Sequence, residues 1–290
     1  MNRSTTLARR LFDRLEPVHA VTYFAPEART ALDALGFRGF WSGYFAARSA
    51  PLGPVPPEVV TAVFYNFAAH RVAKALPAAW DIAAPHAVLA AREEAAVATL
   101  RRYGLADGID TAAELLGAAA RSAAPDGRPL FAANLALPWP EEPLARLWHA
   151  ATLLREHRGD GHVAVLQVLG ISGRESNVLH AAAGRVPADM IKRSRDYDDA
   201  LWQEQVDRLA ARGLLDGTGV LTVAGRDLKA EIEDATDRLA LAAFDVLGET
   251  DLDTLFRALT PLTRLVIDGG DVPAATPMGL DRADLDNDAY

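Results

Sequence analysis

The stretch RGLLDGTGVLTVAGR at residues 212–226 decides the fold predicted for this chain. Two short apolar segments, at residues 214–215 and 220–222, flank a turn that contains Gly217 and Gly219, which predicts a small β-hairpin. Ala224-Gly225-Arg226 then opens a long segment with helical spacing. Upstream, helices are predicted at residues 163–169, 173–183 and 198–212. The expected order is therefore three helices, a hairpin and a closing helix.

That order is the plan of a winged helix-turn-helix unit. Arg212-Gly213-Leu214 before the turn and LTVAG at 221–225 after it resemble the matching phrases of winged-helix regulators of the multiple-antibiotic-resistance type. The whole chain is similar to an uncharacterised actinobacterial helix-turn-helix family, through EPVH at 16–19, YFA at 44–46, APLG at 50–53 and residues 153–162. This resemblance implies a winged-helix fold and no established activity.

Helical patterns dominate the rest of the chain. Leu228, Ile232, Ala235 and Leu239 form one buried stripe, with charged residues on the other faces. Further helices are predicted at residues 6–12, 26–35, 40–48, 57–69, 85–103, 111–122, 143–157 and 252–259. The fold class expected is mostly α, with tandem winged-helix-like repeats, small β-hairpin wings and flanking helices.

The two repeats are inferred from self-similarity at a period of about 107–110 residues. GLADG at 104–108 matches GLLDG at 213–217, Phe40-Trp41 matches Leu147-Trp148, and Arg48 matches Arg155. We therefore expect N-terminal helices at 1–35, a first repeat at 36–138, a second repeat at 139–246, a C-terminal helical extension at 247–278 and a disordered acidic tail at 279–290.

Composition limits the chemistry that is open to the chain. Half of the 290 residues are hydrophobic and 24% are charged, which is ordinary for a globular protein. Because there is no cysteine, disulfides, thiolate nucleophiles and Fe–S clusters are excluded. No phosphate-cradling glycine motif occurs, so no nucleotide cofactor is indicated. No apolar signal segment or membrane span is found, so a cytoplasmic location without a membrane partner is expected.

The charges weigh against strong DNA binding, although the fold favours it. The net charge is −9, and the expected recognition helix begins with the acidic run Asp196-Tyr197-Asp198-Asp199. Asp198 and Asp199 also suit a helix N-cap. The expected DNA contacts are the basic residues just upstream, Lys192, Arg193 and Arg195.

Polar side chains concentrate at residues 148–162. Gly159-Asp160-Gly161 is expected to break the helix and let His162 fold back toward His157. With Glu156 and Asp160, these histidines could form an acid–base catalytic site or bind zinc or iron. A structural or ligand-anchoring cluster is the favoured interpretation, and no metal site is predicted.

A ligand pocket is the other candidate site. Aromatic residues recur at 23–24, 40–45 and 64–67, and they suit either a hydrophobic core or a pocket wall. The candidate ligand contacts are His19, Tyr23, Trp41, Tyr44, Arg48, His149, Arg155 and Arg158. The favoured function is a ligand-responsive DNA-binding transcriptional regulator, whose partners are a small-molecule effector and duplex DNA. The alternatives are a small-molecule-binding protein or enzyme on the same scaffold, and a non-catalytic interaction module.

Overall fold

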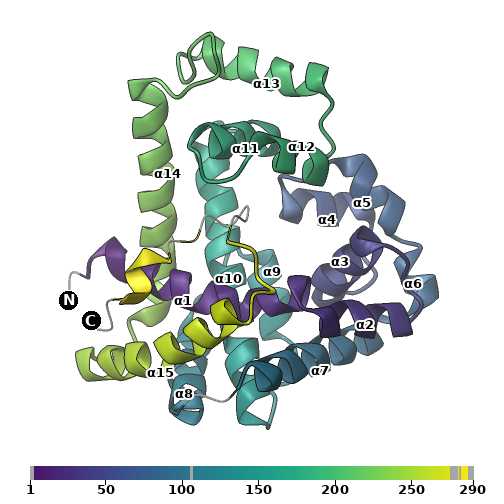
Figure 1. The fold of residues 1–290 in the computed structure, drawn as a ribbon, viewed down its shortest axis with the longest axis vertical. Helices are drawn as coiled ribbons and strands as arrows, with labels where there is room; N and C mark the ends of the chain where they lie inside the picture. The colour runs from purple at the N-terminus through teal and green to yellow at the C-terminus, as the bar shows by residue number, and fades with distance from the viewer. Residues whose placement is uncertain (1–2, 105–106, 275–279, 281, 287–290) are drawn as a thin grey trace.

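The computed structural model describes residues 3–104, 107–274, 280 and 282–286, and its regular elements there are helices (Figure 1). The first half contains α1 (Thr5–Phe24), α2 (Pro26–Ala34), α3 (Phe40–Ser49), η1 (Ala50–Leu52), α4 (Pro57–Phe64), α5 (Ala69–Ala75), α6 (Ala79–Ile82), α7 (Pro85–Tyr103), α8 (Ile109–Ser122) and α9 (Pro129–Leu135). The second half contains α10 (Pro143–Val168), α11 (Gly173–Ala182), α12 (Ala188–Arg195), α13 (Asp199–Ala211), α14 (Val223–Leu241), η2 (Ala242–Phe244), α15 (Glu249–Asp268) and η3 (Ala283–Asp286).

Helix α10 is the central element, and it packs against α1, α7, α8, α9 and α14. The prediction that Gly159-Asp160-Gly161 ends this helix is wrong, because α10 continues to Val168. A side chain at Gly161 would collide with the guanidinium of Arg128, which donates hydrogen bonds to the carbonyls of His157 and Leu239. Glycine here leaves room for the Arg128 side chain and does not form a turn.

The predicted β-hairpin wing is also wrong. Among the described residues there is no strand, and the 212–226 stretch holds one isolated antiparallel bridge, between Leu215 and Leu221. The Asp216 carboxylate accepts hydrogen bonds from the backbone N–H groups of Thr218 and Val220, at 2.8 and 3.1 Å. Backbone N–H groups of the turn therefore bond to the Asp216 side chain. Too few residues remain on either side of the turn to extend a ladder of hydrogen bonds between strands. The tandem winged-helix-like fold class is corrected to an all-helical one over the described part of the chain.

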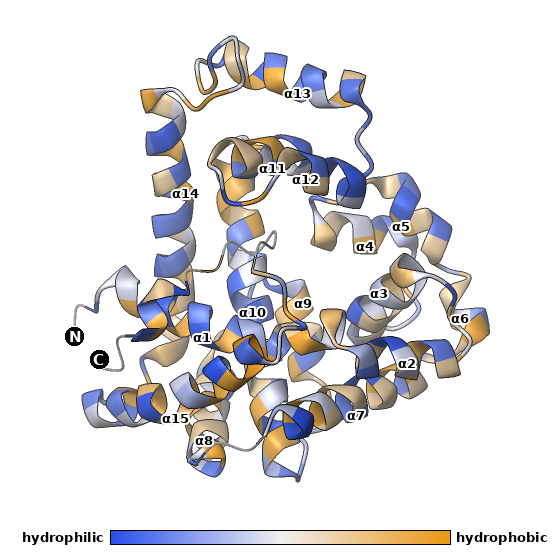
Figure 2. Ribbon diagram, viewed as in Figure 1, coloured by the Kyte–Doolittle hydropathy of each residue, from blue (hydrophilic) through white to orange (hydrophobic). Residues whose placement is uncertain are grey.

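Separate hydrophobic clusters support different parts of the fold. The largest joins α1, α8, α10 and α15, and a second lies among α3 to α7. The end of α10 packs with α11, α13 and α14 around Val165, Leu179, Leu209, Leu215 and Ile232. Hydrophilic and hydrophobic residues alternate along α13 and α14 in Figure 2, as expected for helices with one buried face. The end of α10 thus shares with α11, α13 and α14 a core that is separate from the main one.

Several predicted boundaries change. The helix predicted at 57–69 stops at Phe64, because Tyr65 has a left-handed φ of 54°, and α5 begins only at Ala69. Between the predicted helices at 173–183 and 198–212, where no helix was predicted, the structure has α12. Part of the acidic tail forms η3, where Asp284 pairs with Arg14 at 2.6 Å, while 279, 281 and 287–290 lie outside the described residues. Positions 105–106 of the 104–108 repeat phrase also lie outside them. No described helix is long and apolar enough to cross a membrane.

Candidate functional site

A cavity of about 390 Å³ separates α11, α12 and α14 from the aromatic helices of the first half. Its walls come from α1, α3, α4, α10, α11, α12 and α14. Nine of the chain's 21 aromatic residues line it: Phe12, Tyr23, Phe24, Phe40, Trp41, Tyr44, Phe64, Tyr65 and Phe67. A volume in this range, with mostly apolar walls and a few polar groups, is typical of a small-molecule site.

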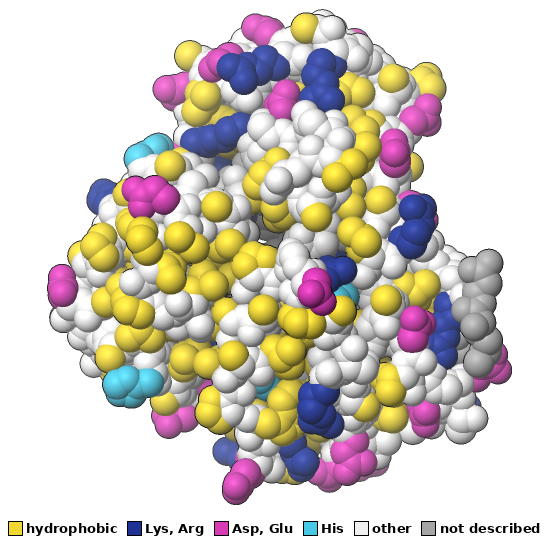
Figure 3. All heavy atoms as spheres, turned by 180° about the vertical axis from the view of Figure 1, so that it is seen from behind, with side chains coloured by type: hydrophobic (Ala, Val, Ile, Leu, Met, Phe, Trp, Pro, Cys, Tyr) yellow, Lys and Arg dark blue, Asp and Glu magenta, His cyan; other side chains and the backbone are white. Residues whose placement is uncertain are grey.

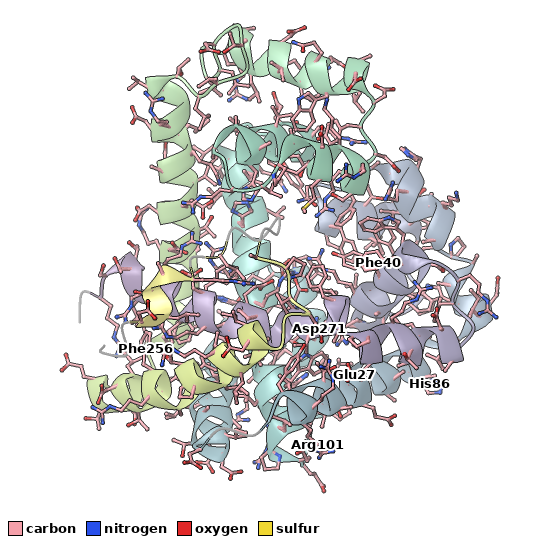
Figure 4. The ribbon with its side chains drawn as sticks, viewed as in Figure 1. Glu27, Phe40, His86, Arg101, Phe256 and Asp271 are labelled. Atoms are coloured by element: carbon pink, nitrogen blue, oxygen red, sulfur yellow. The ribbon has the colours of Figure 1, made fainter. Side chains whose placement is uncertain are left out.

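The aromatic wall is built by side chains that helical spacing brings to one face of α3. Trp41 and Tyr44 both contact Phe67, with ring centroids 5.8 and 5.6 Å apart, and Tyr44 also contacts Tyr23 at 5.2 Å. Phe40 lies at the start of α3, where Figure 4 labels it, and remains 42% exposed. Hydrophobic side chains also gather across the middle of the face seen in Figure 3. The wall can therefore hold a flat, apolar ligand body.

A buried ion cluster lies behind this wall. The Glu156 carboxylate accepts hydrogen bonds from Arg155 at 2.8 Å and from Arg48 at 3.4 Å. Burial alone would raise the pKa of Glu156, but Arg155 and Arg48 hold that pKa at about 2. Glu16 is fully buried and pairs with Arg155 at 3.3 Å. At Glu16 the loss of solvation on burial outweighs the attraction of Arg155. It raises the pKa of Glu16 to about 7, so folding favours the neutral form of this side chain.

A second polar wall comes from α10 and α14. Thr236 donates its hydroxyl hydrogen to the Ile232 carbonyl at 2.6 Å and therefore accepts from His162 Nδ1, at 3.0 Å. This leaves His162 Nε2 as an acceptor, on a residue that lines the cavity. Burial lowers the pKa of His162 to about 3, so the imidazole is neutral at physiological pH. The group can accept a hydrogen bond from a ligand N–H or O–H.

The predicted ligand contacts divide into two groups. Six of them line the cavity: Tyr23, Trp41, Tyr44, Arg48, Arg155 and Arg158. His19 lies behind the wall, where its ring nitrogens are 2.9 Å from the hydroxyls of Thr152 and Tyr23. His149 packs against Trp139 and does not line the cavity. The sequence did not assign Phe12, Lys229 or Glu233 to the site, because their helical spacing fits a core or a solvated face equally well.

The residues proposed for catalysis do not converge. His162 lines the cavity, whereas Glu156, His157 and Asp160 do not. His157 contacts Phe131, and the Asp160 carboxylate accepts the Phe131 backbone N–H at 2.9 Å. Since α10 is unbroken, positions 157 and 162 lie on different sides of the helix. Among the described residues no group of three His, Asp or Glu side chains could hold a metal ion.

The three basic residues assigned to DNA have different environments. Arg193 is exposed. Lys192 pairs with Asp199 at 2.9 Å and lies over the Trp202 ring. Arg195 is 9% exposed and lines the cavity, so it cannot reach a duplex in this conformation. The prediction placed Arg195 on the surface, and the structure turns it inward.

Residues 8–273 match the model of a helix-turn-helix family. No curated protein and no solved structure matches the chain.

Proposed function

The chain belongs to this helix-turn-helix family, and we propose that it binds duplex DNA and that a small molecule held in its cavity alters this binding. In this proposal the exposed face of α13 approaches the DNA, and the ligand lies beneath α11 and α12. The protein is then a ligand-responsive regulator. Its effector enters between the aromatic helices and the segment α11–α14, to which we assign the helix-turn-helix.

The position of the cavity is the observation that supports this proposal. Ser176, His180, Met190 and Ser194 reach it from α11 and α12, and Tyr44 reaches it from α3. A ligand would therefore contact both sides at once. If it binds one arrangement of the two sides more tightly, it shifts the population toward that arrangement, and α13 moves with α12.

The charge on the α13 end limits the strength of DNA binding. Exposed Asp198, Asp199, Glu204, Asp207, Asp216 and Asp227 outnumber exposed Arg208, Arg212 and Arg226. Figure 3 shows Lys and Arg side chains interspersed with acidic ones at this end of the molecule. The Asp198 carboxylate accepts the Leu201 N–H at 2.7 Å and so caps α13. We therefore expect few phosphate contacts.

A mobility-shift titration against the DNA that flanks the protein's own gene tests this proposal. If Arg208, Arg212 and Arg226 each contact a phosphate, raising salt from about 50 to 200 mM should weaken binding by about 40-fold. Arg208→Gln should reduce the salt slope by about 1. The control is Arg101→Gln, an exposed residue that Figure 4 labels at the opposite end of the molecule, and it should leave the slope unchanged. No shift even at low salt would contradict DNA binding.

The acidic α13 face favours one alternative, a small-molecule-binding protein whose helix-turn-helix frame does not contact DNA. The same titration separates the two, because only the regulator gives a shift. An enzyme that uses Glu156, His157, Asp160 and His162 has less support, since only His162 among them lines the cavity.

A further inference from the structure

Building on the proposed ligand cavity, we propose that its ligand is an aromatic monoanion whose carboxylate or sulfonate pairs with Arg195. This deepens the proposed function, because it names the chemical class of the effector and the residue that senses it.

Arg195 is a buried cation without a counter-ion. Among the described residues no carboxylate lies within ion-pair distance of it, and its Nε has no hydrogen-bond partner. Its polar contact is a long one, from Nη1 to the Ser194 carbonyl at 3.4 Å. Burial lowers the pKa of Arg195 to about 10, so it stays charged at physiological pH. An uncompensated buried charge costs stability unless a partner arrives.

The other cations of the cavity already have partners. Arg48 and Arg155 share Glu156, Arg158 pairs with Asp237 at 2.8 Å, and Lys229 pairs with Glu233 at 2.5 Å. Arg195 is the lining cation for which the described part of the chain supplies no carboxylate. A single lining cation without a carboxylate partner fits a monoanion. A polyphosphate would need several cations without carboxylate partners.

The surroundings of Arg195 indicate an aromatic ligand body. Its guanidinium lies 4.0 Å from the Phe67 ring centroid, and Phe67 contacts Trp41 and Tyr44. An acid group at the guanidinium would thus place an attached ring against this aromatic wall. Offset or edge-to-face ring contacts add to the burial of apolar surface.

Arg195 also connects the ligand to α13. It is the last residue of α12, and Asp196 follows it in the left-handed conformation, with φ of 55°. Asp196 accepts hydrogen bonds from Arg71 of α5 and His70, and Asp198 caps α13. A ligand that pulls on Arg195 therefore acts on the short link that sets the position of α13.

Two fluorescent probes test the proposal. Anilinonaphthalene sulfonate is an aromatic anion, and phenylnaphthylamine has the same rings without the acid group. We expect the sulfonate to bind the full-length protein, and Arg195→Gln to weaken its Kd about tenfold or more, the usual value of a charge-assisted hydrogen bond. Phenylnaphthylamine should change by less than about twofold, because it makes only the apolar contacts.

The matched control is Arg193→Gln, an exposed arginine on the same helix, which should change neither Kd. Arg195→Lys keeps the charge and should retain most of the sulfonate affinity, so a folding defect in Arg195→Gln would not hide the answer. The proposal is overturned if neither probe binds, or if Arg195→Gln leaves the sulfonate Kd unchanged or weakens both probes equally. Sulfonate binding at Arg195 without any DNA shift would support this ligand class and contradict the regulator.

Discussion

Gly225→Ala is expected to lower the free energy of unfolding by about 3 kcal/mol. A Cβ atom at this position would overlap the carbonyl oxygen of Leu214, a backbone atom that already accepts the Thr222 N–H at 3.1 Å. The first turn of α14 would have to move away from the turn that joins it to α13. Thermal unfolding should show the loss as a fall in Tm of about 6 °C or more.

Gly217→Ala is the control for that experiment. Gly217 lies in the same turn and does not have a positive φ, and no neighbouring atom lies within 4 Å of the position that a Cβ would take. Its substitution should therefore leave Tm nearly unchanged. Equal Tm values for the Gly225 and Gly217 variants would contradict the close packing of α14 against Leu214.

Glu156→Gln is expected to have the largest effect on stability, a loss of about 4 kcal/mol. Glu156 is buried and is the shared partner of Arg48 and Arg155, so its neutral replacement leaves two buried guanidinium groups with too little negative charge. Urea unfolding near neutral pH measures the change. Glu16 would then supply the remaining charge for Arg155, and its pKa should fall because the repulsion from Glu156 is removed.

Glu204→Gln provides the comparison. Glu204 is an exposed residue on α13 that pairs with Arg208 one turn away, and such pairs contribute about 0.5 kcal/mol or less. If Glu156→Gln cost no more than Glu204→Gln, the ion cluster behind the aromatic wall would not be a buried network that shapes the cavity.

The helices that the sequence predicted best are those with one apolar face. The stripe at Leu228, Ile232 and Ala235 packs inward from α14, although its fourth member, Leu239, is 40% exposed, and 85–103 is α7. Glycine residues misled the prediction of helix ends, because glycine occurs both in tight turns and where helices pack closely. At Gly161 it admits Arg128, whereas Gly219, with φ of 83°, does shape a turn. The β wing was wrong because the Asp216 side chain takes backbone donors that a longer hairpin would need.

The sequence predicted part of the site, namely the residues whose spacing along the chain could be recognised. Tyr44 and Arg48 lie four residues apart, and Arg48 matches Arg155 in the predicted repeat, which allowed the three to be grouped before their partners were known. Arg195 was misplaced because a basic residue near a recognition helix usually faces solvent, and sequence spacing does not reveal which cations are buried. The tandem repeat remains a prediction.

The central claim is that ligand in the cavity acts on the α12–α13 link through Arg195. Amide hydrogen exchange of residues 188–199, measured with and without saturating anilinonaphthalene sulfonate, tests it most directly. Exchange across these residues should be slower in the wild-type protein with the probe bound, and unchanged in Arg195→Gln at the same probe occupancy. Unaltered exchange at 188–199 while the probe is bound to the wild-type protein would contradict it.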